Sequence, residues 1–243
     1  MVSMTIFKHY KKHQMEYENF LRHKRVALVG PSKSALQEKN GSYIDSHDIV
    51  VRIKNAIPAI NGQEEYLGSR TDVIYNVFSR GALSLSEFKL DNVLFICCPT
   101  PITRRLTPHF FKVFEKTNNG YSFYEKYKIR LMKEEVYKTL ASQVKKKPNA
   151  GTGTIWDLLQ FEINELYITG IDFFRSDYQK SYLKTHNIRL NNAEYIKSTL
   201  KGHDPDTQYL WFKQVYKKDS RIKLDDFMNR IVKNKKYDIL FGQ

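Results

Sequence analysis

The chain has 243 residues, of which 41% are hydrophobic and 14% aromatic, enough to fill the core of one large α/β domain. Forty lysines and arginines against 26 acidic residues give a formal net charge of +14, which favours anionic partners without choosing among nucleotides, nucleic acids, anionic lipids and acidic glycans. The two cysteines, Cys97 and Cys98, are neighbours in an apolar run, so a disulfide framework is excluded and a reducing, cytoplasmic compartment is favoured.

Residues 1–24 form a basic amphipathic arm in which apolar and aromatic residues recur in a loose helical pattern. The arm lacks the apolar core of a secretory signal, and no stretch of the chain approaches the roughly 20 apolar residues that span a bilayer. A helix of this kind can pack on its own domain or lie on a membrane surface. Packing on the domain is favoured, with peripheral contact at the inner face of the membrane as the alternative.

Short, β-branched and continuously apolar segments follow the arm, as is typical of strands covered on both faces of a sheet. They lie at residues 26–29, 48–53, 72–77, 92–98 and 165–171. Residues 102–147 have a basic helical pattern, and a further helix is expected from about residue 205 to 217. This alternation predicts a single α/β domain over residues 25–243, with a mostly parallel sheet flanked by helices.

A glycine turn ends the first of these strands. The apolar run stops at Gly30, and Pro31 and Ser32 lead into a segment that can open a helix at Ser34. A junction of strand, turn and helix start presents unpaired backbone N–H groups and the positive end of a helix dipole, so it can seat a phosphate. Many corners of this kind bind nothing, so the turn alone leaves both interpretations open.

A second glycine turn contains Gly151, Thr152, Gly153 and Thr154 and precedes an apolar helix over residues 155–161. The N-terminus of that helix could receive another part of the same anionic ligand. A plain loop with a helix cap has the same appearance in the sequence.

His203 stands immediately before the helix that Asp204 can cap. Its unperturbed pKa lies near neutrality, which makes it the best candidate in the chain for a proton acceptor, although a polar loop histidine is the ordinary alternative. The sequence has no metal-ligand spacing and no Asp-x-Asp flanked by apolar strand residues.

In this order, the segments resemble the motifs of glycosyltransferase family 29, the eukaryotic-type sialyltransferases. The long motif is similar to residues 26–32, 50–56 and 68–72, and the short motif to residues 148–153 through 165–170. The very short motif, a histidine followed a few positions later by a glutamate, is similar to His203 with Gln208 in the glutamate's place. The resemblance covers about residues 24–218.

The resemblance implies a variant Rossmann-like (GT-A-like) fold and a CMP-activated sugar acid, sialic acid or Kdo, as donor. It implies inverting transfer to a hydroxyl of a glycan or lipid-linked saccharide, without a metal or other cofactor. His203 would take the proton from that hydroxyl. The nucleotide would be lined by Gly30, Ser32, Asn55, Gly151, Thr152 and Gly153.

The sequence departs from the family pattern at the nucleotide side. Pro31 replaces an asparagine, and Lys54 stands where the asparagine of Arg-x-Asn is expected, with Asn55 one place later. Either Asn55 substitutes, or Lys54 binds the phosphate as a point charge. The alignment of the short motif is open by two residues, so either Gly151 or Gly153 corresponds to the motif's glycine.

Three further departures concern the rest of the pattern. The two motif cysteines are missing, which agrees with a cytosolic microbial or viral member of the family. The family's third motif has no clean counterpart near residues 178–182. Either His186 serves in its place, or His186 is a plain loop histidine. Gln208 carries no negative charge, so the electrostatic role of the usual glutamate is altered or absent.

Two other functions compete with this prediction. A relative that uses a different nucleotide sugar is suggested by Pro31 and Lys54. A basic nucleic-acid-binding protein fits the charge and the aromatic residues, but the lysines and arginines are spread along the chain and no RNA or DNA motif is present, so no nucleic-acid partner is expected.

Overall fold

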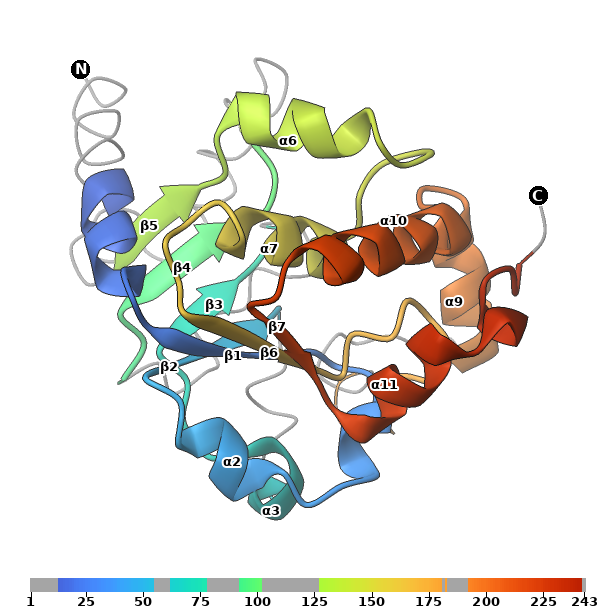
Figure 1. Cartoon of the computed structure of the whole chain (residues 1–243), viewed down its shortest axis with the longest axis horizontal. Helices are drawn as coiled ribbons and strands as arrows, with labels where there is room; N and C mark the ends of the chain where they lie inside the picture. The colour runs from blue at the N-terminus through green and yellow to red at the C-terminus, as the bar shows by residue number, and fades with distance from the viewer. Residues whose placement is uncertain are drawn as a thin grey trace.

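A computed structural model describes residues 13–54, 62–77, 92–101, 127–180, 182 and 192–241. Asn55 and His186 therefore lie outside the described residues. Within them the chain forms a seven-stranded sheet in the order β5-β4-β3-β2-β1-β6-β7, in which neighbouring strands pair in parallel (Figure 1). The strands are β1 (Arg25–Val29), β2 (Ile49–Ile53), β3 (Val73–Tyr75), β4 (Phe95–Cys98), β5 (Lys128–Leu131), β6 (Glu165–Thr169) and β7 (Ile222–Leu224). The predicted α/β fold with a parallel sheet is confirmed.

Strand β1 lies at the centre of the sheet, between β2 and β6. Its side chains alternate between two cores: Val26 and Leu28 belong to one, and Ala27 and Val29 to the other. Both faces of the strand are therefore buried, which is why its sequence is continuously apolar. The strand order reverses at β1, because later strands are added first on the β2 side and then on the β6 side.

Helices cover the two faces of the sheet. Figure 1 shows α2 and α3 on one face and α7 and α10 on the other. The described helices are α2 (Gly41–Asp45), α3 (Glu64–Leu67), α6 (Glu134–Ala141), α7 (Ala150–Leu158), α9 (Asn192–Leu200), α10 (Pro205–Lys218) and α11 (Asp226–Lys233), with short 3-10 turns η1 (Lys33–Leu36) and η4 (Lys235–Tyr237). Residues 13–21 are also helical, and they bury Tyr17 and Leu21 in the larger core. None of the helices in this described part of the chain has the length and apolar character needed to cross a membrane.

Two predictions about local structure were wrong. Residues 128–131 form strand β5 instead of continuing a helical region. The strand was missed because Arg130 has the character of a solvent-exposed residue, yet it is buried. The glycines of the second turn lie inside α7 and not before it, because the Asn149 side chain caps the helix by accepting the Thr152 N–H at 2.8 Å.

A buried polar network joins α7 to the sheet. Arg130 of β5 donates from Nη2 to Asp157 Oδ1 of α7 at 2.8 Å, and a second bond joins Nη1 to Oδ2. Tyr75 of β3 donates its hydroxyl to Asp157 Oδ2 at 2.5 Å, and the Tyr17 hydroxyl lies 3.1 Å from that of Tyr75. The guanidinium also stacks over the Tyr17 ring, with its carbon 4.9 Å from the ring centroid. Each charge is thus paired, as burial requires.

Arg130→Met is expected to lower the free energy of unfolding by about 3–5 kcal/mol, because it leaves the Asp157 carboxylate buried without its cation. Lys138→Met is the matched control, since it breaks an ion pair with Glu134 in which both side chains are mostly exposed, 72% and 57%. The control should change stability by no more than about 0.5 kcal/mol in urea unfolding. Equal effects of the two substitutions would show that the network does not anchor α7.

Candidate active site

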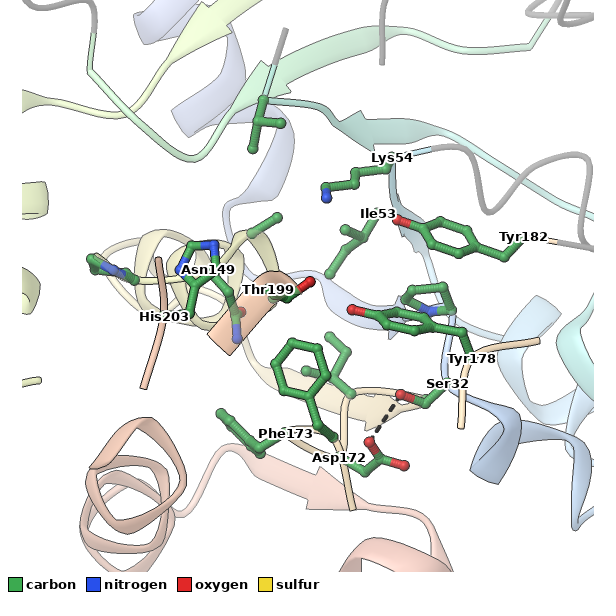
Figure 2. A pocket seen from close by; sticks show the side chains of 18 of the residues that line it. Ser32, Ile53, Lys54, Asn149, Asp172, Phe173, Tyr178, Tyr182, Thr199 and His203 are labelled. Atoms are coloured by element: carbon green, nitrogen blue, oxygen red, sulfur yellow. Dashed lines mark hydrogen bonds between the residues drawn. The ribbon is translucent and has the colours of Figure 1, made fainter. Parts of the chain in front are cut away.

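A cavity of about 550 Å³ opens beyond the carboxyl ends of β1, β2 and β6. In parallel sheets this edge, at the strand where the order reverses, is where ligands bind. The cavity is lined by the segments that follow these three strands, by the start of α7, and by Tyr178, Tyr182, Tyr195 and Thr199 from the chain around α9. Figure 2 shows Asn149 and His203 on one side of it, and Lys54, Tyr182, Tyr178 and Ser32 on the other.

The first glycine turn contributes side chains to this cavity but no free amide groups. Pro31 has no N–H, and the neighbouring N–H groups are bonded within the chain. These bonds, of 2.6–3.2 Å, join Gly30 to Thr169, Ser32 to Gly170, Lys33 to Asp177 and Ser34 to Ser176. The expected unpaired N–H groups are therefore not found at this turn, and η1 beyond it is only a four-residue 3-10 turn.

The second glycine turn does offer free amide groups. Asn149 caps α7, and among the described residues no acceptor is found for the N–H groups of Ala150 and Gly151, both of which line the cavity. They lie at the positive end of the helix dipole. An anionic group in the cavity would therefore meet donors here at no cost in internal hydrogen bonds.

Lys54 adds a cation to the cavity. It follows β2 in a left-handed backbone conformation, with φ at 51°, and its N–H donates to the Tyr75 carbonyl at 2.6 Å. Figure 2 shows its ammonium group pointing into the cavity. Burial lowers the pKa of Lys54, and no carboxylate within the described residues forms an ion pair with it.

His203 faces the cavity from the loop before α10. Its Nδ1 lies 2.7 Å from the Lys147 carbonyl oxygen, which can only accept, so Nδ1 carries the proton and Nε2 is left as an acceptor. Burial lowers the pKa of His203, the bond to Lys147 raises it, and the cations of Lys54, Lys147 and Lys146 lower it further. The net shift is downward, so the imidazole is kept neutral.

The sequence pointed to only some of the residues at this site. Ser32, Lys54, Gly151 and His203 line the cavity. Gly30, Thr152 and Gly153 lie behind the lining: Gly30 packs on Gly170, Gly153 packs on Pro99, and Thr152 is fully buried. The roles predicted for these residues in nucleotide binding stay predictions.

Asp172 is a cavity residue that sequence reasoning missed. It is fully buried, and its Oδ1 accepts the Ser32 hydroxyl at 2.9 Å, while Ser176 donates to its other oxygen. Burial raises the pKa of Asp172, and the serine hydroxyls lower it. Its position just after β6, at the carboxyl edge of a parallel sheet, was the available signal.

The aromatic wall beside Asp172 was also missed. Phe173 and Phe174 both have left-handed backbones, with φ at 54° and 64°. Tyr178 pairs with Ser32 through an antiparallel bridge and stacks on Tyr182 at 5.2 Å between ring centroids. No periodic pattern of residues predicts a wall that is built from such an irregular segment.

Comparison with known proteins agrees with the motifs. Residues 2–94 match the model of glycosyltransferase family 29 (sialyltransferase). The resemblance to this family is therefore confirmed over the segment that carries the long motif. No curated protein matches the chain in sequence.

Solved structures share the fold of this chain. A mammalian sialyltransferase is 19% identical over 84% of this chain and 69% of its own, with a TM-score of 0.52. A mammalian sialyltransferase in complex with Gal-β-1,3-GalNAc-ortho-nitrophenol is 18% identical over 86% and 71%, also at 0.52. The sialyltransferase CstII from Campylobacter jejuni, in complex with cytidine-5′-monophosphate as a substrate analogue, is 17% identical over 83% and 79%, at 0.51.

Gly30→Ala tests the close contact between the turns after β1 and β6. An added Cβ would lie 2.2 Å from the Gly170 carbonyl oxygen, so the cavity wall at Gly170 must move, and we expect a loss of about 1–3 kcal/mol of unfolding free energy. In Gly202→Ala the new Cβ would meet only Thr199, at 3.9 Å, and stability should change by no more than about 0.5 kcal/mol. Urea unfolding of both variants measures the difference, and a tolerated alanine at position 30 would contradict the described packing.

Proposed function

We propose that the chain transfers sialic acid, or a related 2-keto sugar acid such as Kdo, from its CMP donor to a hydroxyl of a glycan or lipid-linked saccharide. The observation that carries the proposal is that His203, Lys54 and the free N–H groups of α7 face one cavity. A donor of this class bears a phosphate and a carboxylate, and both charges suit a cationic cavity with amide donors. The complex of CstII with cytidine-5′-monophosphate supports CMP as the nucleotide.

The transfer needs one displacement. The acceptor oxygen forms a bond to the anomeric carbon as the bond from that carbon to the CMP phosphate oxygen breaks, and the electron pair leaves with CMP. Nε2 of His203 takes the proton of the acceptor hydroxyl, because Nδ1 is already protonated and bonded to Lys147. Attack opposite to the leaving group inverts the configuration at the anomeric carbon.

Stabilisation of the leaving group is proposed to be metal-independent. The developing charge on the CMP phosphate would be met by Lys54 and by the N–H groups of Ala150 and Gly151. Lys54 is then the phosphate-binding point charge that replaces the usual asparagine. Because Pro31 and Lys54 both depart from the family pattern, a different nucleotide sugar is the alternative donor.

The acceptor and the cellular setting are also proposals. The complex of a mammalian sialyltransferase with a disaccharide derivative supports a glycan acceptor. We place the protein in the cytoplasm, at the inner face of the membrane. Exposed Ile239 and Leu240 next to exposed Lys235 and Lys236 provide an apolar and basic edge for such contact.

Incubation with CMP-Neu5Ac and CMP-Kdo, separately and with excess EDTA, tests the reaction. We expect release of CMP from one donor in the presence of EDTA, and a loss of about 10²–10⁴-fold in kcat in His203→Gln, because the base is removed. CMP should bind more tightly than UMP or GMP in a thermal-shift panel. Full activity of His203→Gln, together with no preference for CMP, would refute the proposal.

On the acid side of the pH profile, kcat/KM should fall with an apparent pKa below the ordinary pKa of histidine. His203 must be neutral to accept a proton, and its lowered pKa keeps it neutral to lower pH. Lys54→Met removes one of the cations that lower this pKa, so the acid limb should move to higher pH. Lys145→Met, at an exposed lysine on the same loop as Lys146, should leave it in place. An acid limb that is the same in Lys54→Met would mean that another group titrates.

A further inference from the structure

Gln208 occupies the place of the glutamate in the very short motif, yet it is fully buried and every polar atom of its side chain is bonded. It lies in the first turns of α10, on the side that faces α7 and the loop before it. Its amide makes three hydrogen bonds, two through the oxygen and one through the nitrogen. The two atoms serve different parts of the site.

The amide oxygen holds the N-terminus of α7. Oε1 of Gln208 accepts the N–H of Asn149 at 3.0 Å and the hydroxyl of Thr152 at 2.7 Å. Asn149 is the cap of α7, and Thr152 is fully buried one turn into the helix. These bonds fix the turn that presents the free N–H groups of Ala150 and Gly151 to the cavity.

The amide nitrogen holds the carbonyl to which His203 is bonded. Nε2 of Gln208 donates to the Lys147 oxygen at 3.2 Å, and the same oxygen accepts the Nδ1–H of His203 at 2.7 Å. The backbone also pairs here, since Lys146 and His203 form an antiparallel bridge and the Lys147 N–H donates to Gly202 at 3.3 Å. One carbonyl therefore receives a hydrogen bond from both side chains.

We propose that Gln208 is a positioning residue whose neutral amide holds His203 and the N-terminus of α7 in one geometry. The amide accepts on one side and donates on the other, which an ionised carboxylate at this place could not do. The significance of His203 rests on the function proposed above, but the positioning itself is a property of the folded chain.

A glutamate at position 208 would keep the acceptor half and lose the donor half. Its second oxygen would face the Lys147 carbonyl oxygen, and the repulsion would turn that carbonyl away from His203. The new negative charge would also favour the charged imidazole. The charged groups that act on His203 are the cations of Lys54, Lys146 and Lys147, while the carboxylate of neighbouring Asp204 is bonded to the Thr207 N–H as the cap of α10.

The test is a long-range ¹H–¹⁵N NMR titration of the seven histidines in the full chain, with His203 assigned from the spectrum of His203→Gln. The wild type should show the Nδ1–H tautomer for His203. Gln208→Glu should raise the titration midpoint of His203 and weaken that tautomer preference. Gln208→Met, which removes donor and acceptor without adding charge, should weaken the tautomer preference without the upward shift, and it should move the backbone amide signals of Asn149 and Thr152.

Gln160→Glu is the matched control, because Gln160 is exposed and its amide nitrogen also donates to a backbone carbonyl, that of Trp156, at 2.9 Å. It should leave the His203 ring unchanged. A His203 tautomer and midpoint equal to the wild type in both Gln208 variants would overturn the proposal, whatever their thermal stability. No donor is needed for this measurement, so failure to bind or cleave a CMP-sugar would refute the proposed function and not the role of Gln208.

Discussion

The placement of α7 is the constraint on which the site depends. Near its C-terminal end, Asp157 is bonded to Arg130 of β5 and Tyr75 of β3, in the middle of the core. At its N-terminal end, Gln208 and the Asn149 cap hold the first turn. A helix of nine residues that is bonded at both ends cannot slide or rotate without breaking buried polar contacts, which are costly to leave unmade. The two free amide groups of its first turn are thereby held at the cavity.

Small residues allow α7 to approach its neighbours this closely. A Cβ on Gly151 would lie 2.9 Å from the Ile171 side chain, and one on Gly153 would lie 3.0 Å from the Pro99 carbonyl. Sequence reasoning assigned both glycines to a phosphate-binding turn. In the structure, Gly151 lines the cavity while Gly153 lets the helix pack on the segment after β4. The two glycines thus have different surroundings, and which of them contacts the nucleotide stays a prediction.

The departures from the family pattern have physical reasons in the fold. Pro31 lacks an N–H, but the amide groups of its turn are used in bonds within the chain, and the Pro31 carbonyl accepts the Gln179 N–H at 3.0 Å. This turn therefore holds the segment that carries Tyr178 and Tyr182. Gln208 lacks the charge of a glutamate, but its nitrogen has a carbonyl to donate to. The bond from the Gln208 amide nitrogen is one that an ionised glutamate could not make, whereas the Pro31 carbonyl contact is open to any residue.

The sequence by itself determined the strands around β1 and the helix that begins after Asp204, and it predicted a role for His203, which lines the cavity. These features depend on local patterns of apolar residues and caps, which contacts far along the chain do not alter. Only the tertiary structure decided that β5 is a strand, because the burial of Arg130 depends on Asp157, 27 positions away. It likewise decided which turn has free amide groups, since those of the first turn are bonded to segments about 140 residues further on. The roles of Asp172 and Gln208 arise from such contacts between distant segments, which no local pattern encodes.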